Sequence, residues 1–252
     1  MSTKDNKHFT ILMMGYNSVE WIDKCVQSAL FQDYDNFDVI AIDAMTTDGT
    51  YDNLKTYEVY ENFKLIRNTK RQYQTENTLT GVKMAKDNSI ICTLDFDDWL
   101  LDQNVLSRLN EIYCDEVWMT YGSYLDYNGE SYYAPRDFVS YPKSVFETNT
   151  FREHRWLASH LRTFRKELFL KIDTNDFIDN ETGQMYEMSG DLSFMLPMLE
   201  MSGERQTVVN DFLYAYNKCN PLSDDKVSLA EQVRQANQIK QRKKYERLVT
   251  LD

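Results

Sequence analysis

Three aspartates, Asp95, Asp97 and Asp98, stand at the end of an apolar run in ICTLDFDDWL, residues 91–100. So much like charge at the end of a buried strand needs a physical cause, because neighbouring carboxylates repel one another. Asp-x-Asp at a strand end turns two carboxylates toward one point, which suits a hard divalent cation such as Mg²⁺ or Mn²⁺. Such an ion can neutralise a diphosphate as it leaves. Asp97 and Asp98 equally suit the start of a following helix, so the pattern alone leaves a helix cap open.

The elements before this cluster alternate between strand and helix. Short apolar or β-branched runs predict strands, and the stretches between them have helical spacing. The predicted strands are 8–14, 37–43, 63–68 and 89–96, and the predicted helices are 15–32, 51–60 and 76–87. This alternation is typical of parallel βαβ units, in which ligands bind beyond the carboxyl ends of the strands. Tyr16, Asn17, Asp43, Asp95 and Asp97 are therefore expected on one rim.

The second half of the chain has a less regular pattern. We expect helices over 101–113 and 190–203, strands over 116–127 and 207–217, a Tyr-rich loop over 127–142, and a segment over 154–172 that begins as a loop and ends as a helix. A polar helix follows over 228–248, and its Lys and Arg residues suit a docking or dimer helix, a solvated helix, or contact with anionic lipid.

Composition excludes several classes of function. The 252 residues are 42% hydrophobic and carry a net charge of −12, so the chain can bury a core but has no basic excess for nucleic acid. Its 4 cysteines form no CxxC pair, which argues against a zinc site. No signal peptide or apolar run of about 18 residues is present, so we expect a cytoplasmic protein without a transmembrane segment. Peripheral contact with a membrane is left open.

The motifs of residues 9–102 resemble those of family 2 glycosyltransferases, which have the GT-A fold. The stretch TILMMGYNSVEWIDKCVQSALFQDYDNFDVIAIDAMTTDGTYD is similar to the opening of that family, and TLDFDDWL resembles its Leu-Asp-Ser-Asp-Asp-Trp-Leu metal motif. The resemblance implies an α/β GT-A sandwich with a mostly parallel sheet flanked by helices. It divides the chain into a GT-A domain over 1–222 and a helical tail over 223–252. Within the domain, 1–102 would bind the nucleotide sugar and 103–222 the acceptor.

The resemblance also implies a reaction and a set of ligands. The protein would move a sugar, with inversion, from a nucleotide-diphosphate donor such as a UDP-sugar to a glycan, lipid-linked or protein acceptor. Asp95 and Asp97 would hold Mn²⁺ or Mg²⁺ against the diphosphate, with Asp98 close behind. The nucleotide-sugar site would comprise Gly15, Tyr16, Asn17, Asp43, Arg71, Asp95 and Asp97.

Two positions depart from the family pattern. Met14 replaces a proline, which affects loop stiffness, and Ala44 replaces the second residue of an Asp-Asp pair. In several family members that second aspartate contacts the uracil ring. The identity of the base is therefore open, and so is the alternative of a degenerate module that binds a glycan or nucleotide without turnover. A sugar-phosphate nucleotidyltransferase is a weaker alternative, because MMGYNSVEW lacks a Gly-rich loop with a basic residue.

An inverting transfer needs a general base for the acceptor hydroxyl. The family draws it from a Glu-Asp pair at a helix start, where this chain has Gly190 and Asp191, so Asp191 is the candidate base and Glu187 the reserve. An aspartate at a helix start is also a common cap. In some relatives a histidine joins the metal ligands, which makes His160 a candidate, with a structural histidine as the alternative.

Other side chains are weaker candidates. Arg162 and Arg165 could pair with a diphosphate or with surface carboxylates, since guanidinium groups suit both. The rings of Trp156 and Tyr186 are candidates for stacking on a sugar, although most aromatic side chains in such a chain belong to the core.

Overall fold

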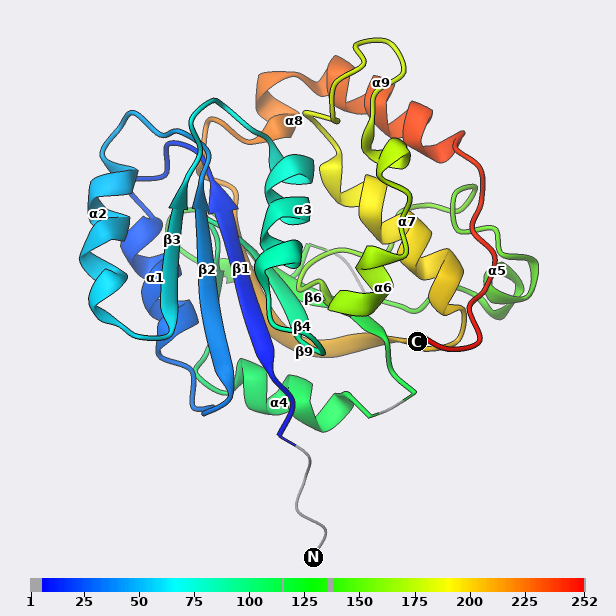
Figure 1. The fold of residues 1–252 in the computed structure, drawn as a ribbon, viewed down its shortest axis with the longest axis horizontal. Coiled ribbons are helices and arrows are strands. Elements are labelled where there is room, and N and C mark those ends of the chain that lie inside the picture. Colours follow the sequence, from blue (N-terminus) through cyan, green and yellow to red (C-terminus); the bar gives the residue numbers. More distant parts are fainter. Residues whose placement is uncertain (1–5, 115, 136–137, 252) are drawn as a thin grey trace, which may run out of the picture.

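The structure is a computed structural model that describes residues 6–114, 116–135 and 138–251. Within these residues the chain forms a nine-stranded sheet in the order β3-β2-β1-β4-β8-β6-β9-β5, with β7 paired to β6. Helices cover both faces of the sheet (Figure 1). The prediction of an α/β fold with a mostly parallel central sheet is confirmed.

The first half is a regular parallel βαβ array. Its elements are β1 (Phe9–Gly15), α1 (Ile22–Leu30), β2 (Phe37–Asp43), α2 (Thr50–Thr56), the 3-10 turn η1 (Tyr57–Val59), β3 (Phe63–Arg67), α3 (Gln74–Met84) and β4 (Ile90–Asp95). In the parallel registers Gly15 pairs with Asp43 and Met14 with Asp95. The carboxyl ends of β1, β2 and β4 therefore meet at one edge, as predicted from the alternation.

The second half extends the sheet with strands of both directions. Its elements are β5 (Trp99–Leu100), α4 (Val105–Ile112), β6 (Met119–Tyr127), β7 (Tyr132–Tyr133), α5 (Lys143–Thr148), β8 (Thr163–Arg165), α6 (Lys166–Leu170), the 3-10 turn η2 (Thr174–Phe177), α7 (Gly190–Ser202), β9 (Gln206–Asn217), α8 (Asp224–Val227) and α9 (Leu229–Lys240). Short β8 is antiparallel to both β4 and β6, whereas β6 and β9 are parallel. The end of β9 reaches β5, directly after the aspartate cluster.

Alternation along β1 divides the core into two layers. Ile11 and Met13 face a cluster that includes residues of α1 and α4, while Leu12 and Met14 face a cluster that includes residues of α3 and α7. A strand buried on both faces is expected where helices cover both sides of a parallel sheet. The two layers hold the edge that carries Asp95 between α1 on one side and α3 and α7 on the other.

The C-terminal segment packs on the body of the protein. Helix α9 lies beside α7 (Figure 1), and its Ile239 is buried in the core cluster that contains α7 residues. Beyond α9, the backbone N–H of Leu248 donates to the carbonyl of Met201 at 2.9 Å. In the described part of the chain, no helix combines the length and apolar character needed to cross a bilayer.

Candidate active site

A cleft of about 440 Å³ opens at the edge of the sheet where β1 and β4 end. Most of the residues predicted for the site line it: Gly15, Tyr16, Arg71, Asp95, Asp97, His160 and Asp191. Elements from both halves of the chain contribute to its wall, including the start of α3, the start of α7 and the segment after β9. The cleft therefore joins the predicted donor half to the predicted acceptor half.

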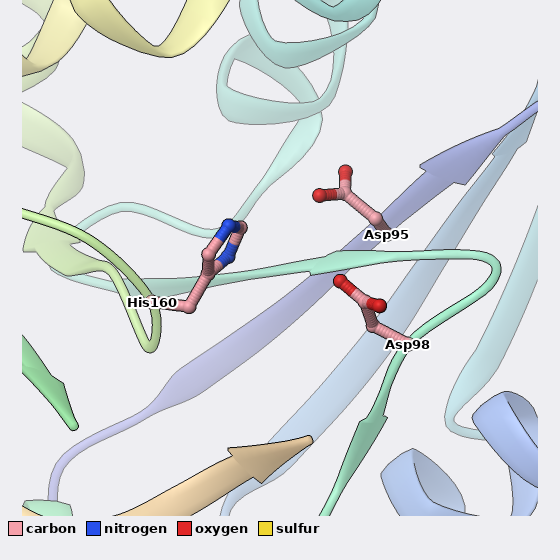
Figure 2. A group of neighbouring side chains, drawn as sticks. All are labelled: Asp95, Asp98 and His160. Carbon is pink, nitrogen blue, oxygen red and sulfur yellow. The ribbon is translucent and has the colours of Figure 1, made fainter. Parts of the chain in front are cut away.

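Two carboxylates and one imidazole converge inside the cleft. One ligand atom from each of Asp95, Asp98 and His160 lies within 4.8 Å of the other two. Figure 2 shows the three side chains directed toward a common space, the carboxylates from the end of β4 and its loop and the ring from the segment before β8. Carboxylate oxygens with one imidazole nitrogen form a donor set that suits Mn²⁺ and related divalent ions.

Two hydrogen bonds from β9 hold the carboxylate of Asp98. Its Oδ2 accepts a hydrogen bond from the Tyr214 hydroxyl at 2.5 Å, and its Oδ1 accepts one from the backbone N–H of Asn217 at 2.7 Å. Burial, and then the charges of Asp97 and Asp95, raise the pKa of Asp98 well above its usual value. A bound cation would remove that repulsion, so the cluster fits a metal ion electrostatically.

The surroundings of His160 favour its neutral form. Its ring stacks on Tyr214 with centroids 4.6 Å apart. Burial, and then the charge of Arg162, lower its pKa well below the ordinary value for histidine. Neutral imidazole is the form that binds metals, so this environment suits the ligand role predicted for His160.

Asp97 lies in the same cleft but outside that three-residue cluster. Its Oδ2 accepts a hydrogen bond from the side-chain amide of Asn220 at 2.7 Å, and burial raises its pKa. The structure thus places Asp98, rather than Asp97, beside Asp95 and His160. The metal-ligand role of Asp97 stays a prediction.

The predicted nucleotide side of the cleft contains a close backbone approach and a stacked cation. A Cβ atom on Gly15 would lie 2.5 Å from the Cβ of Phe96, so only glycine lets the end of β1 pass the loop that follows β4. The guanidinium of Arg71 lies 3.4 Å from the ring centroid of Tyr16, a cation–π arrangement. Arg71 and Tyr16 also line a second hollow with Met45, Thr47 and Tyr73.

Asn17 and Asp43 form hydrogen bonds with the backbone of the loop after β2. Asn17 Oδ1 accepts a hydrogen bond from the Thr47 N–H at 2.9 Å, which joins the loops after β1 and β2. Asp43 is fully buried, with Oδ1 bonded to the Thr46 N–H and Oδ2 3.2 Å from Nε of Arg67. Neither residue is among those that line the cleft within the described chain, so direct contact of either with a nucleotide stays a prediction.

Asp191 stands on the opposite wall, in the first turn of α7. Its Oδ2 accepts a 2.6 Å hydrogen bond from Arg162, and its Oδ1 accepts one from the Leu192 N–H at 2.9 Å. The second guanidinium nitrogen of Arg162 lies 3.4 Å from Nδ1 of His160. One arginine therefore connects the candidate base to the candidate metal cluster.

Several residues that hold the aspartates of the cleft were not predicted from the sequence. Tyr214 and Asn217 fix Asp98 from β9, and Asn220 fixes Asp97 from the segment after it. They lie 116, 119 and 123 positions after the aspartates to which they are bonded. The pairings of β9 with β5 and β6 bring them there, and no local motif in the sequence predicts these pairings.

Three weaker candidates lie elsewhere. Tyr186 has 0% of its surface exposed, so the prediction that its ring stacks on a sugar is wrong. Trp156 packs against a hydrophobic core cluster. Arg165 donates to the backbone carbonyls of Val117 and Cys114, so the structure gives it a role in bracing a loop rather than in binding a diphosphate. Glu187 does line the cleft. Burial raises the pKa of Tyr73, and the negative charge of Glu187 raises it further.

Comparison with known proteins agrees with this architecture. Residues 10–186 match the model of the family described as glycosyl transferase family 2. The chain is 20% identical over 219 residues to the glycosyltransferase GlyA of Streptococcus pneumoniae. This match covers 82% of this chain and 30% of GlyA. It is 26% identical over 130 residues to WfaP of Escherichia coli, a UDP-Glc:α-D-GlcNAc-diphosphoundecaprenol β-1,3-glucosyltransferase, covering 52% of this chain and 48% of WfaP.

Among solved structures, residues 1–349 of S. aureus TarS in complex with UDP-GlcNAc have a similar fold. The TM-score is 0.62 at 17% identity, and the match covers 84% of this chain and 59% of the TarS fragment. The chain spans less than half the length of the two curated relatives, at 30% and 48%.

Proposed function

Because the chain belongs to glycosyl transferase family 2, we propose that it is an inverting, metal-dependent transferase that uses a nucleotide-diphosphate sugar. A UDP-sugar is the proposed donor, and the acceptor is a glycan, a lipid-linked saccharide or a protein. The names of the relatives support the donor class, since WfaP uses UDP-Glc and TarS binds UDP-GlcNAc. The observation that carries the proposal is one cleft containing Asp95, Asp98 and His160 on one wall and Asp191 on the other.

In this mechanism the first wall holds the donor. Asp95, Asp98 and His160 would bind Mn²⁺ or Mg²⁺, and Asp97, which lines the same cleft, would share that task. When bound, the ion supplies positive charge to the diphosphate leaving group. Tyr16 and Arg71 would contact the nucleotide together, with the Arg71 guanidinium stacked over one face of the Tyr16 ring.

Asp191 on the second wall would act as the general base. The acceptor oxygen forms a bond to the anomeric carbon while the bond from that carbon to the diphosphate oxygen breaks, and the hydroxyl proton moves to the Asp191 carboxylate. Attack from the face opposite the leaving group inverts the anomeric centre. Arg162 holds that carboxylate in place at 2.6 Å and so fixes the direction from which the proton is taken.

Thermal unfolding in the presence of nucleotides tests the donor assignment. UDP-glucose, UDP-GlcNAc, UDP, GDP-mannose and GDP are each added with and without Mn²⁺. A ligand that binds only the folded state raises the midpoint in proportion to the logarithm of its concentration over Kd. We expect a Mn²⁺-dependent rise with the uridine compounds. A rise with guanosine compounds alone would reassign the base, in keeping with Ala44.

Turnover separates the enzyme from a binding module. Release of UDP from the donor that gives the largest shift is measured for the native protein and for Asp191→Ala. A nucleotide-sugar shift without any UDP release, even with saccharide acceptors added, would favour the degenerate module. The absence of a shift with every compound and metal would contradict the proposal as a whole.

A further inference from the structure

We propose that helix α9 is a working part of the active site, because it positions the turn that carries Asp191. This inference rests on the proposed function, in which Asp191 is the general base. The segment 178–189 leads into α7. Hydrogen bonds join this segment to residues on one face of α9. The residues on that face of α9 are positioning residues, since they act on Asp191 only through the segment that precedes it.

Three glutamines spaced three residues apart make these bonds. Gln238 Oε1 accepts hydrogen bonds from the Tyr186 hydroxyl at 2.7 Å and the Asn180 N–H at 2.9 Å. Gln235 Oε1 accepts one from the Met188 N–H at 2.8 Å. The backbone carbonyl of Gln232 accepts one from the Ser189 hydroxyl at 3.1 Å. Residues three apart lie on one helix face, so α9 follows the segment as a continuous brace.

Gln235 is the central contact of this brace. It has 2% of its surface exposed, and its Nε2 donates to Glu231 Oε1 at 2.8 Å. Glu231 thereby fixes the orientation of the amide, so that Oε1 faces the Met188 N–H. Removal of this amide would leave the Met188 N–H without that acceptor, three residues before Asp191.

The turn between α9 and Asp191 is tight and is held on its other side as well. Ser189 has φ of +53°, and α7 begins at the next residue, Gly190. A Cβ atom on Gly190 would lie 2.7 Å from Thr75 Oγ1, so the start of α7 is in close contact with the start of α3. The backbone beside Asp191 is therefore fixed between α3 and α9, and loss of either support would let the carboxylate move.

The same helix also reaches the cleft directly. Gln232 lines the cleft wall together with Glu187 and Ser189. The acceptor side is thus built in part from the C-terminal segment. A tail that served only to dock on a lipid surface or a second copy would not need these contacts.

The test compares Gln235→Ala with Asn237→Ala, which truncates an exposed amide on the outer face of α9. We expect Gln235→Ala to speed hydrogen exchange in residues 186–192 at least about tenfold and to lower kcat for UDP release to a similar degree. The donor KM and the Mn²⁺-dependent shift with UDP should stay unchanged, because the metal cluster lies on other elements. Asn237→Ala should behave as the native protein does.

A residue exchange provides the rescue. In Glu231→Gln with Gln235→Glu, the carboxylate at position 235 still accepts from the Met188 N–H and the amide at position 231 donates to that carboxylate, so protection and kcat should recover. Should Gln235→Ala lose exchange protection in β1 and β2 as well, and so fail to fold, Gln238→Ala carries the same comparison. Unchanged exchange in 186–192, or a kcat within twofold of Asn237→Ala, would overturn the inference. Lack of any nucleotide-sugar binding or turnover by the native protein would instead contradict the proposed function, which the exchange data do not depend on.

Discussion

Arg162 donates a 2.6 Å hydrogen bond to Asp191, and its other terminal nitrogen lies 3.4 Å from Nδ1 of His160. The guanidinium is 5% exposed and the carboxylate 18% exposed. A buried cation in this position fixes the orientation of Asp191 and favours neutral His160. The candidate base and the candidate metal cluster are thus connected through a single side chain.

Replacement of Arg162 should separate the effect of charge from that of geometry. We expect Arg162→Ala to lower kcat about 100-fold, because Asp191 loses the group that orients it. Arg162→Lys keeps the charge but lacks the planar fork, so an intermediate loss is expected. Steady-state UDP release by both variants provides the measurement. Full activity of the alanine variant would show that Asp191 needs no orienting partner or is not the base.

The two walls of the cleft should also respond differently to loss of a carboxylate. Asp95→Ala and Asp97→Ala are expected to remove most of the Mn²⁺-dependent rise in unfolding temperature with UDP, because metal ligands hold the donor. Asp191→Ala is expected to keep that rise and to abolish turnover. Thermal unfolding and UDP release on the same three preparations check both statements.

Among these variants Asp97→Ala is the most informative. Asp97 is bonded to Asn220 and lies outside the cluster of Asp95, Asp98 and His160. A native-like metal response in Asp97→Ala would assign the second carboxylate ligand to Asp98. Asp98→Asn then becomes the decisive variant, since its amide oxygen still accepts from the N–H of Asn217 and its amide NH2 can donate to the Tyr214 hydroxyl oxygen.

The regular half of the fold could be predicted from the sequence because its signals are local. Apolar runs bounded by turn residues predicted strands that the structure has at Phe9–Gly15, Phe37–Asp43, Phe63–Arg67 and Ile90–Asp95. Parallel connections then place the ends of β1, β2 and β4 at one edge, which is why the alternation predicts Asp95 on the same rim as Tyr16 and Asp43.

The remaining contacts depend on pairings between distant segments. Strand β5 has only two residues, Trp99 and Leu100, and gives no periodicity, yet its pairing with β9 brings Tyr214 to Asp98. The contact of Arg162 with Asp191 joins two segments, and neither contains a sequence pattern that predicts the contact. Helix α9 looked like a solvated or docking helix, because the glutamines that brace segment 178–189 are polar and add nothing to an apolar stripe.

The effects of substitutions at Gly81 in α3 and Leu12 in β1 on stability should be coupled, because the two residues are in close contact. A Cβ atom on Gly81 would lie 2.2 Å from Cδ1 of Leu12, which is fully buried. Gly81→Ala should cost about 1–3 kcal/mol through overpacking, and Leu12→Ala about 2–5 kcal/mol through the cavity it leaves. In the double variant the added methyl enters the emptied space, so the cost should fall below the sum by at least about 1 kcal/mol. Urea unfolding of all four proteins gives this coupling, and additive costs would contradict the contact.

The brace between α9 and segment 178–189 should make stability depend on acid pH. Arg234 donates hydrogen bonds to Asp179, which is 1% exposed, and these bonds lower the pKa of Asp179 to about 2. An unfolded chain has an aspartate pKa of about 3.9, so folding favours the ionised form. The resulting stabilisation, about 2 kcal/mol, is fully present above that pKa and is lost as the pH falls toward 2.

Arg234→Ala should therefore lower the free energy of unfolding at pH 7 by more than loss of an exposed ion pair does, and it should flatten the decline of that free energy between about pH 5 and pH 2. Lys143→Ala is the matched control, because Lys143 pairs with Glu147 at 3.5 Å on an exposed helix surface. Such a pair contributes about 0.5 kcal/mol or less. Urea unfolding at a series of pH values measures both variants. The free energy of unfolding of Arg234→Ala could instead decline with acid as steeply as that of the native protein. The contact with Arg234 would then not lower the pKa of Asp179, and the bond between α9 and the segment leading to Asp191 would contribute little to stability.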